Sequence, residues 1–467
     1  MTATKKKKAD FTQGKLFVPI LLFALPIMAT GLLQLLYNMA DQVIVGRFSG
    51  DPNALAAVGS TSSLTHLVVN FLIGISTGTG VLVAQLFGAK NTERIGPAVH
   101  TSLTFALLGG IAVGAFGAFT AKPLLSLMGT KLEVLEAATL YIRIIFAGLP
   151  GAAVYNFGAA VLRSMGNSRT PLIVLATTGL ANVVFNLVFV ICFKMSVAGV
   201  ALATIISQYM SAVAVIAVLA RTDGPHRFRF KKIGIELATL VQVLRVGVPS
   251  ALQGCLFSFA NVIIQSATNT FATTTVAAFS LANTVEGLTY TAMNSFHHAA
   301  ITVVGQNYGA HERGRIRKAL LYSLIQVAAV GLIVAGFEIL FAKELATLFV
   351  DTSLPESGEI VSAAVSRMQL MLATYVLCGI MDVLTGYLRG IGYSLWPMFS
   401  CVFGVCALRV LWVLMVFPLV PTPTGLLVSF PISWGITILL HLVTCIFANR
   451  KLKKEFGTAV AFRIGVK

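Results

Sequence analysis

The sequence predicts an all-α integral membrane protein, with twelve transmembrane helices in two six-helix lobes related by a parallel internal repeat. Of its 467 residues, 57% are hydrophobic and only 11% are charged, whereas soluble domains are usually about 25% charged. The apolar residues form long runs, and each run reaches the ~20 residues that span a bilayer. These runs use almost the whole length, which leaves no room for a separate catalytic domain.

Each predicted span is an apolar run that ends where charged residues, Gly or Pro gather. The first six runs cover 17–46, 54–88, 98–121, 134–162, 171–192 and 197–220. The second six cover 238–269, 275–308, 318–342, 360–390, 396–418 and 424–448. We therefore expect a basic tail at 1–16, an N-lobe at 17–220, a basic linker at 221–237, a C-lobe at 238–448 and a second basic tail at 449–467.

The charge distribution predicts the topology. Lys and Arg outnumber Asp and Glu by 34 to 17, and most of the bases fall in alternate connections. Cytoplasmic loops carry such an excess, so we expect a multi-pass protein of the cell inner (plasma) membrane with both termini cytoplasmic. Anionic membrane lipids, rather than nucleic acid, are the expected partners of these bases.

An internal repeat relates the two halves. Residues 83–89 (VAQLFGA) recur at 304–310 (VGQNYGA), and residues 162–166 (LRSMG) recur at 388–392 (LRGIG). Because each half has an even number of spans, both halves start on the same side of the membrane. Parallel repeats of this kind suit two lobes that open alternately to the two sides.

Polar side chains inside spans are the candidates for function, because an ionisable group in the bilayer core costs about 3 kcal/mol and tends to mark an ion or proton path. Gln34, Asn38 and Asp41 share one face of the first span, since they lie at i, i+4 and i+7. In the second repeat the position equivalent to Asp41 is occupied by Ile264. The fold itself therefore does not require an acid at this position. The competing interpretation is a hydrated carboxylate near the interface.

Two later spans carry oxygens that could complete a site around Asp41. Asn182 and Asn186 share a face of the fifth span, and Thr204 on the sixth could reach the same pocket. Carboxylate, amide and hydroxyl oxygens suit a hard monovalent cation or a proton. Hydrogen bonding between helices is the alternative role for the two Asn side chains.

The C-lobe has a different polar set. Its members are Asn261 and Gln265 in the seventh span, Glu286 in the eighth, Asp382 in the tenth and Arg409 in the eleventh. Arg409 could pair with the two acids structurally, or one acid could remain to meet a cationic substrate. Glu338 lies five residues before Lys343, and we expect it at the interface.

The chain lacks the motifs of several enzyme classes. It has no P-loop, no Ser-His-Asp order and no HExxH, which gives no support for an ATP-driven pump or a membrane protease. Energy would then come from an ion gradient. The six cysteines form no CxxC pair, so we expect no metal site. An intramembrane transferase would need paired acids, or a His and a carboxylate, on a membrane-facing loop, and we expect no enzyme.

Several motifs together resemble the multidrug and toxin extrusion (MATE) family, particularly its DinF-like bacterial branch. They are residues 25–26 (LP) with 36–46 (LYNMADQVIVG), 85–89 (QLFGA) with 306–310 (QNYGA), and the LRSMG and LRGIG pair. The resemblance covers 15–450 and implies a V-shaped pair of lobes that exports cationic, amphipathic small molecules in exchange for H⁺ or Na⁺. It implies no other cofactor, and we expect a monomer.

The same resemblance assigns roles to particular residues. It implies that the N-lobe cation site contains Asp41, Asn182, Asn186 and Thr204. Pro26 lies fifteen residues before Asp41, where it permits a kink and would act as a hinge.

Two departures leave the coupling ion open between H⁺ and Na⁺. The branch named for the norfloxacin pump carries a Glu on the seventh helix, which here offers only Gln253, Asn261 and Gln265. The DinF-like branch keeps an acid on the fifth helix, where this chain has Asn186. The alternative function is a flippase for a lipid-linked saccharide or another lipid. A cavity for an anionic headgroup would need several bases, whereas these spans hold four acids and Arg409.

Overall fold

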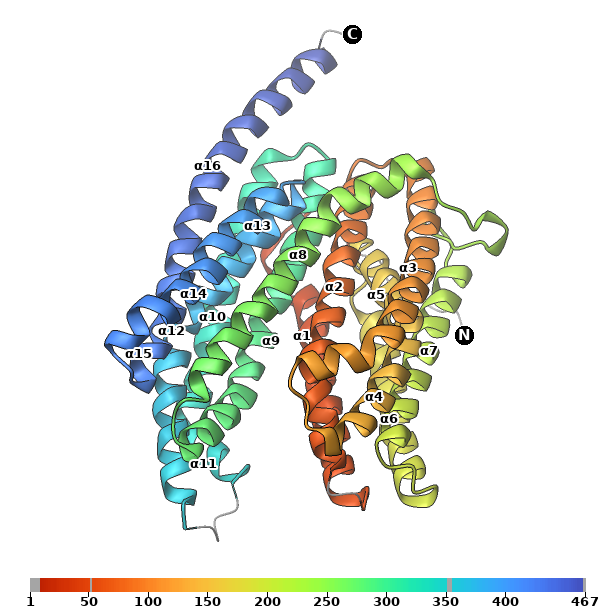
Figure 1. The fold of residues 1–467 in the computed structure, drawn as a ribbon. Helices are drawn as coiled ribbons and strands as arrows, with labels where there is room; N and C mark the ends of the chain where they lie inside the picture. The colour runs from red at the N-terminus through yellow and green to blue at the C-terminus, as the bar shows by residue number, and fades with distance from the viewer. Residues whose placement is uncertain (1–8, 51–52, 351–354, 465–467) are drawn as a thin grey trace. The chain divides into compact units, whose positions relative to one another are not determined.

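The computed structural model describes residues 9–50, 53–350 and 355–464. Within these ranges the chain is almost entirely helical and contains no strand, which confirms the predicted all-α class (Figure 1). The predicted basic tails at 1–16 and 449–467 lie partly outside the described residues.

The first half of the chain forms helices α1 to α7. They are α1 (Phe17–Phe48), α2 (Ala54–Gly88), α3 (Thr92–Leu127), α4 (Leu132–Ala147), α5 (Leu149–Ser164), α6 (Arg169–Leu187) and α7 (Ser196–Arg221). A π-helical turn at Val188–Cys192 prolongs α6, and a 3-10 turn at Phe230–Lys232 lies in the predicted linker.

The second half forms α8 to α16. They are α8 (Leu237–Thr268), α9 (Thr273–Gly309), α10 (Arg313–Leu340), α11 (Ala342–Thr347), α12 (Ser357–Gly390), α13 (Leu395–Cys401), α14 (Leu408–Leu411), α15 (Pro423–Leu427) and α16 (Ser429–Ile464). The π-helical turns Val402–Ala407 and Trp412–Val416 and the 3-10 turn Phe417–Leu419 continue α13 and α14 as one span.

Ten helical segments among the described residues are long and apolar enough to cross a membrane. The pair α4 and α5 passes the same test together, as one span bent by 44°. Helix α9 is 37 residues long but rich in Thr, Asn and His, and it is not among the ten. With α9 and the bent pair, these segments account for the twelve predicted spans.

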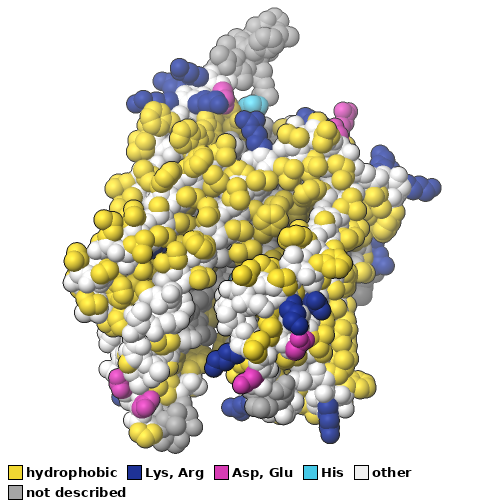
Figure 2. All heavy atoms as spheres, in the orientation of Figure 1, with side chains coloured by type: hydrophobic (Ala, Val, Ile, Leu, Met, Phe, Trp, Pro, Cys, Tyr) yellow, Lys and Arg dark blue, Asp and Glu magenta, His cyan; other side chains and the backbone are white. Residues whose placement is uncertain are grey.

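The outward faces of the helices are apolar. Figure 2 shows hydrophobic side chains over most of the visible surface, with few charged side chains among them. Phe119, Leu340 and Phe447 are 83%, 79% and 62% exposed. Soluble monomers rarely expose apolar patches of this extent, so these faces are suited to contact with lipid.

The chain packs as two compact units. Unit 1 comprises Ala29–Ala251 with the chain up to Asp10, and unit 2 comprises Phe11–Met28 with the chain from Leu252 onward. Two helices therefore change unit along their length, α1 after Met28 and α8 after Ala251. The two lobes bounded at 220 and 238 remain a prediction, and the units differ from them in where the first turns of α1 and α8 belong.

The start of α8 belongs to unit 1 because glycines let it approach α2 closely. A Cβ atom on Gly78 would lie 2.1 Å from the carbonyl oxygen of Val243, and one on Gly247 would lie 2.7 Å from that of Ile75. Small residues allow this backbone contact between membrane helices.

The start of α1 belongs to unit 2 through hydrogen bonds to its backbone and the residues before it. Arg315 donates from Nη2 to the carbonyl oxygen of Phe11 at 2.7 Å, and Asn307 donates to the same oxygen at 3.2 Å. Gln326 donates to the carbonyl oxygen of Phe17 at 2.6 Å. These bonds satisfy backbone groups that would otherwise be costly to bury.

Candidate functional site

Asp41 and Asn186 meet inside unit 1. Asn186 on α6 is fully buried and donates from Nδ2 to Oδ1 of Asp41 at 2.5 Å and to Oδ1 of Asn182 at 3.3 Å. Thr204 on α7 also hydrogen-bonds Asp41. The structure therefore brings together all four residues that the sequence assigns to the cation site, which we call the Asp41 cluster (Asp41, Asn182, Asn186 and Thr204).

The hydrogen bonds of this cluster leave acceptor oxygens available. Asn186 uses its amide N–H groups on Asp41 and Asn182, and its buried Oδ1 has no hydrogen-bond partner. The Thr204 hydroxyl donates to the carbonyl oxygen of Val200 at 2.9 Å. A hydroxyl has a single proton, so Thr204 can donate to Val200 or to Asp41 but not to both at once. With Oδ1 of Asn186 also unpaired, the cluster has acceptor oxygens that are suited to a proton or a cation.

Other residues flank the Asp41 cluster. Tyr141 on α4 is buried and lies close enough to interact with the charge of Asp41. Gln34 and Asn38, on the same helix as Asp41, are exposed. The polar stripe predicted on the first span is therefore present, although only its acid joins the buried contacts described above.

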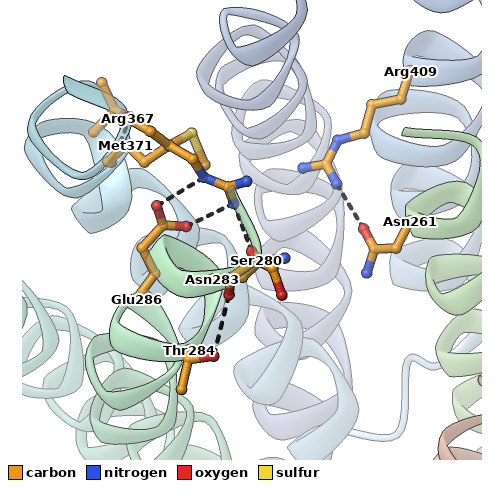
Figure 3. Close-up of polar contacts among 9 residues, drawn as sticks. Asn261, Ser280, Asn283, Thr284, Glu286, Arg367, Met371 and Arg409 are labelled. Atoms are coloured by element: carbon orange, nitrogen blue, oxygen red, sulfur yellow. Dashed lines mark hydrogen bonds and ion pairs between the residues drawn. The ribbon is translucent and has the colours of Figure 1, made fainter. Parts of the chain in front are cut away.

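In unit 2, Glu286 pairs with Arg367 rather than with Arg409 (Figure 3). Arg367 on α12 donates from Nε and Nη2 to the two carboxylate oxygens of Glu286, each at 3.1 Å, and from Nη2 to Oδ1 of Asn283 at 2.6 Å. Both charged side chains are buried, at 7% and 1% exposed. The charge of Glu286 is thus neutralised by a two-pronged ion pair.

Arg409 has a different setting. It donates to Oγ of Ser433 at 3.1 Å and to Oδ1 of Asn261 at 3.5 Å, and its guanidinium lies 4.0 Å from the ring centre of Phe430 and 5.9 Å from that of Trp434. Figure 3 shows Arg409 and Asn261 together and apart from Glu286. Among the contacts of the described residues, Arg409 pairs with neither Glu286 nor Asp382, and aromatic faces and neutral oxygens surround this base.

Asp382 has a third set of partners in unit 2. Its carboxylate accepts from Nδ2 of Asn294 at 3.2 Å, and its backbone carbonyl lies 2.7 Å from Nδ1 of His297. That contact places the proton on Nδ1, so Nε2 can accept from Arg389 at 3.4 Å. Arg389 also donates to Gln253 at 2.8 Å. This acid is held by a neutral histidine, an amide and the charge of a nearby base.

Two further predicted positions, Gln265 and Glu338, differ in their exposure. Gln265 is exposed and bonds Asn269 at 2.9 Å, away from Asn261, although both amides lie on α8. Glu338 is only 1% exposed, so it is buried in the protein, and its expected depth at the membrane interface stays a prediction. It lies on α10 beside Ile339 and one turn after Ala335, which belong to an apolar cluster that also includes Ala342 and Val285.

The sequence analysis does not single out Arg367 or Arg389. Both are buried within α12, at 7% and 6% exposed. The signal that could have found them is their position inside the predicted span at 360–390. Among the described residues there is no group of three or more His, Cys, Asp and Glu side chains placed to hold a metal ion.

Comparison with known proteins gives several long matches. "Probable multidrug resistance protein YoeA" of Bacillus subtilis is 27% identical over 430 residues, covering 90% of this chain and 91% of that protein. "Probable multidrug resistance protein NorM" of Thermotoga maritima is 27% identical over 391 residues, covering 80% of each. A protein named "FAD transporter" from Shewanella oneidensis is 23% identical over 427 residues, covering 89% of this chain and 90% of that protein.

Solved structures share the fold. A MATE protein in complex with MaL6 superposes with a TM-score of 0.89 at 24% identity, covering 96% of this chain and all of that one. An outward-facing multidrug resistance MATE transporter gives 0.87 at 23% identity, covering 97% of this chain and all of that one. These matches confirm the twelve-helix, two-lobe fold class, and the protein is a multi-pass membrane protein. The MatE family model matches residues 26–188 and 249–414, more than half of the chain, and the protein belongs to that family.

Proposed function

We propose that this protein is a secondary active antiporter that exports cationic or amphipathic small molecules in exchange for H⁺ or Na⁺. The observation that carries the proposal is the Asp41 cluster, where one acid meets an amide and a hydroxyl from two other helices. The multidrug resistance names of the relatives support it. We assign no enzymatic step and no cofactor besides the coupling ion.

Coupling would depend on the charge of Asp41. When ionised, Asp41 attracts a cation, and binding of H⁺ or Na⁺ removes that attraction. The resulting repacking of α1 would use Pro26, because a proline inside a helix removes a hydrogen bond and permits a bend. An ion can drive this change only to the extent that it binds the two arrangements of the helix with different affinity.

Asp382 is the more suitable acid for meeting a cationic substrate in unit 2. Glu286 is neutralised by Arg367, and the charge of Arg409 lies against Phe430. We propose Asn261 and Gln265 as neutral polar contacts for the substrate in unit 2, and Gln34 and Asn38 as such contacts in unit 1. Aromatic faces can hold a cation near such groups.

The placement in the cell is also a proposal. We infer a plasma-membrane monomer with both termini cytoplasmic, because the bases gather in alternate connections. Arg227, Arg229 and Lys232 line a cavity of about 670 Å³ beside the start of α3. Glu93 and Glu236 line the same cavity, so the proposed contact with anionic lipid headgroups rests on its three bases.

The test is ethidium efflux from pump-deficient cells that express the wild type, Asp41→Asn or Asp223→Asn. The proton gradient is collapsed in one arm and sodium is withdrawn in another. We expect Asp41→Asn to abolish efflux, whereas Asp223→Asn, a change of an exposed linker residue, leaves it intact. The arm that stops wild-type efflux identifies the ion.

Normal efflux by Asp41→Asn would overturn the role of Asp41. If well-expressed wild type exports no ethidium, the alternatives are a lipid flippase or a narrower substrate. Release of flavin into the medium is then the next measurement, because one relative is named as an FAD transporter.

A further inference from the structure

Glu338 is a buried acid that the proposed mechanism does not use. It lies near the end of α10 in unit 2 and is only 1% exposed. No hydrogen bond of ordinary length to a described residue satisfies either of its carboxylate oxygens. Its neighbour on α9 is Thr289, whose fully buried hydroxyl oxygen also has no partner. Two unsatisfied polar groups therefore lie next to each other in the interior.

The charges around Glu338 do not balance an ionised carboxylate. Glu286 on α9 lies close enough to repel it, and the charge of Arg367 is already taken up by Glu286 through two hydrogen bonds. Among the described residues, Arg367 makes the one ion pair in this region. Tyr375 on α12 faces the same pair, and Lys343 and Glu344 on the neighbouring α11 are exposed.

The surroundings of Glu338 favour neutralisation by a proton over a metal cation. The apolar cluster that contains Ala335, Ala342 and Val285 provides no oxygen ligands from its side chains. A buried charge without a partner is strongly unfavourable, and a carboxylate avoids this by taking up a proton. A protonated carboxyl is also a donor, and Thr289 is the adjacent acceptor.

We propose that Glu338 is a second proton-binding site, located in unit 2, with Thr289 as the acceptor of its proton. The structure then represents a state in which Glu286 is ionised and paired while Glu338 is neutral. A role in antiport rests on the function proposed above, whereas the presence of the proton does not. Loss of this proton would place two negative charges beside one Arg367.

The test is infrared difference spectroscopy on the purified full chain in sodium-free buffer at neutral pH. We expect a carboxylic-acid C=O stretch in the wild type that Glu338→Gln loses. Glu344→Gln makes the same change at an exposed acid on α11, and we expect it to keep the band. Exchange into heavy water shifts the band if it belongs to a protonated carboxyl.

Identical wild-type and Glu338→Gln spectra in the C=O region would overturn the proposal, because Glu338 would then be ionised. If Glu338→Gln does not fold, Glu338→Asp keeps an acid and should shift the band, and an unchanged spectrum would again overturn it. The measurement requires no transported substrate. Failure of the ethidium assay and absence of the band are therefore independent results.

Discussion

The ion pair between Arg367 and Glu286 illustrates how a charge is kept inside a membrane span. The guanidinium satisfies both carboxylate oxygens and Asn283, and it also lies 4.7 Å from the ring centre of Phe279. A buried pair adds little net stability over apolar packing, but removal of one partner leaves an uncompensated charge. Replacing one partner of the pair should therefore lower the stability of the protein more than replacing both partners together.

We predict that Arg367→Met lowers the free energy of unfolding by about 3–5 kcal/mol. The double variant Arg367→Met with Glu286→Leu should lose less than Arg367→Met alone, because no orphan charge remains. Thermal denaturation in detergent measures both. The matched control is the exposed pair of Lys122 with Glu136, at 50% and 78% exposed, where Lys122→Met should cost no more than about 1 kcal/mol. A double variant as unstable as the sum of the single changes would contradict this account.

Helical spacing was sufficient to place Asn182 and Asn186 on one face, and the structure has them hydrogen-bonded at 3.3 Å. Their meeting with Asp41 was implied by the family resemblance, since spacing within one helix does not determine how two helices face each other. The partner of Glu286 was not predicted for the same reason. Arg367 and Arg409 were both available in sequence, and only packing separates them.

At the scale of elements, contact between α2 and α8 depends on glycine. Gly78 is buried and faces the backbone of Val243, whereas Gly59, on the same helix, has nothing within 4 Å of an added Cβ. Within α2, the close approach of α8 therefore requires a glycine at position 78, whereas it does not require one at position 59.

Gly78→Ala should destabilise the protein by roughly 1–3 kcal/mol, because a methyl group 2.1 Å from a carbonyl oxygen forces the helices apart. Gly59→Ala should be neutral or stabilising by roughly 0.5–1 kcal/mol, since alanine favours a helix interior. Both are measured as shifts of the thermal midpoint. Equal shifts for the two variants would show that the α2–α8 approach is not tight.

The apolar runs predicted where spans exist, and the structure has a helical segment at each. They did not predict the bend of 44° between α4 and α5 or the π-helical turns after Leu187 and Cys401. The bend lies at Gly148 and Pro150, where glycine and proline interrupt a helix, and hydropathy does not register such a break.

At the scale of the whole molecule, the distribution of bases predicts which loops face the cytoplasm. In a cysteine-free background, Asp223→Cys in the linker should react with a membrane-impermeant maleimide only after the cells are permeabilised. Lys131→Cys, in the exposed connection before α4, should react in intact cells. The reverse pattern would place the termini outside, and mass-tag labelling on a gel distinguishes the two.

The start of α1 belongs to unit 2 and the start of α8 belongs to unit 1. This assignment could not be predicted from the sequence. Pro26 and Pro249 recur at the repeat and lie close to the points where α1 and α8 change unit, after Met28 and Ala251. A proline indicates a possible bend in the helix, but it does not determine which unit the residues on each side of the bend pack against. That depends on contacts between residues far apart in the chain.

Those distant contacts have a consequence for biosynthesis. The segment around Phe11 and Phe17 bonds residues that follow it by 295 to 309 positions. At a translation rate of about 5–20 residues per second, these partners leave the ribosome on the order of tens of seconds later. After α1 has been inserted into the bilayer, the rest of unit 1 is synthesised before the partners of the start of α1 exist. The start of α1 therefore stays without these partners during that time. Insertion and assembly of this chain are separate events, and a nascent chain that stalls before α10 lacks Arg315 and Gln326, so the start of α1 cannot join unit 2.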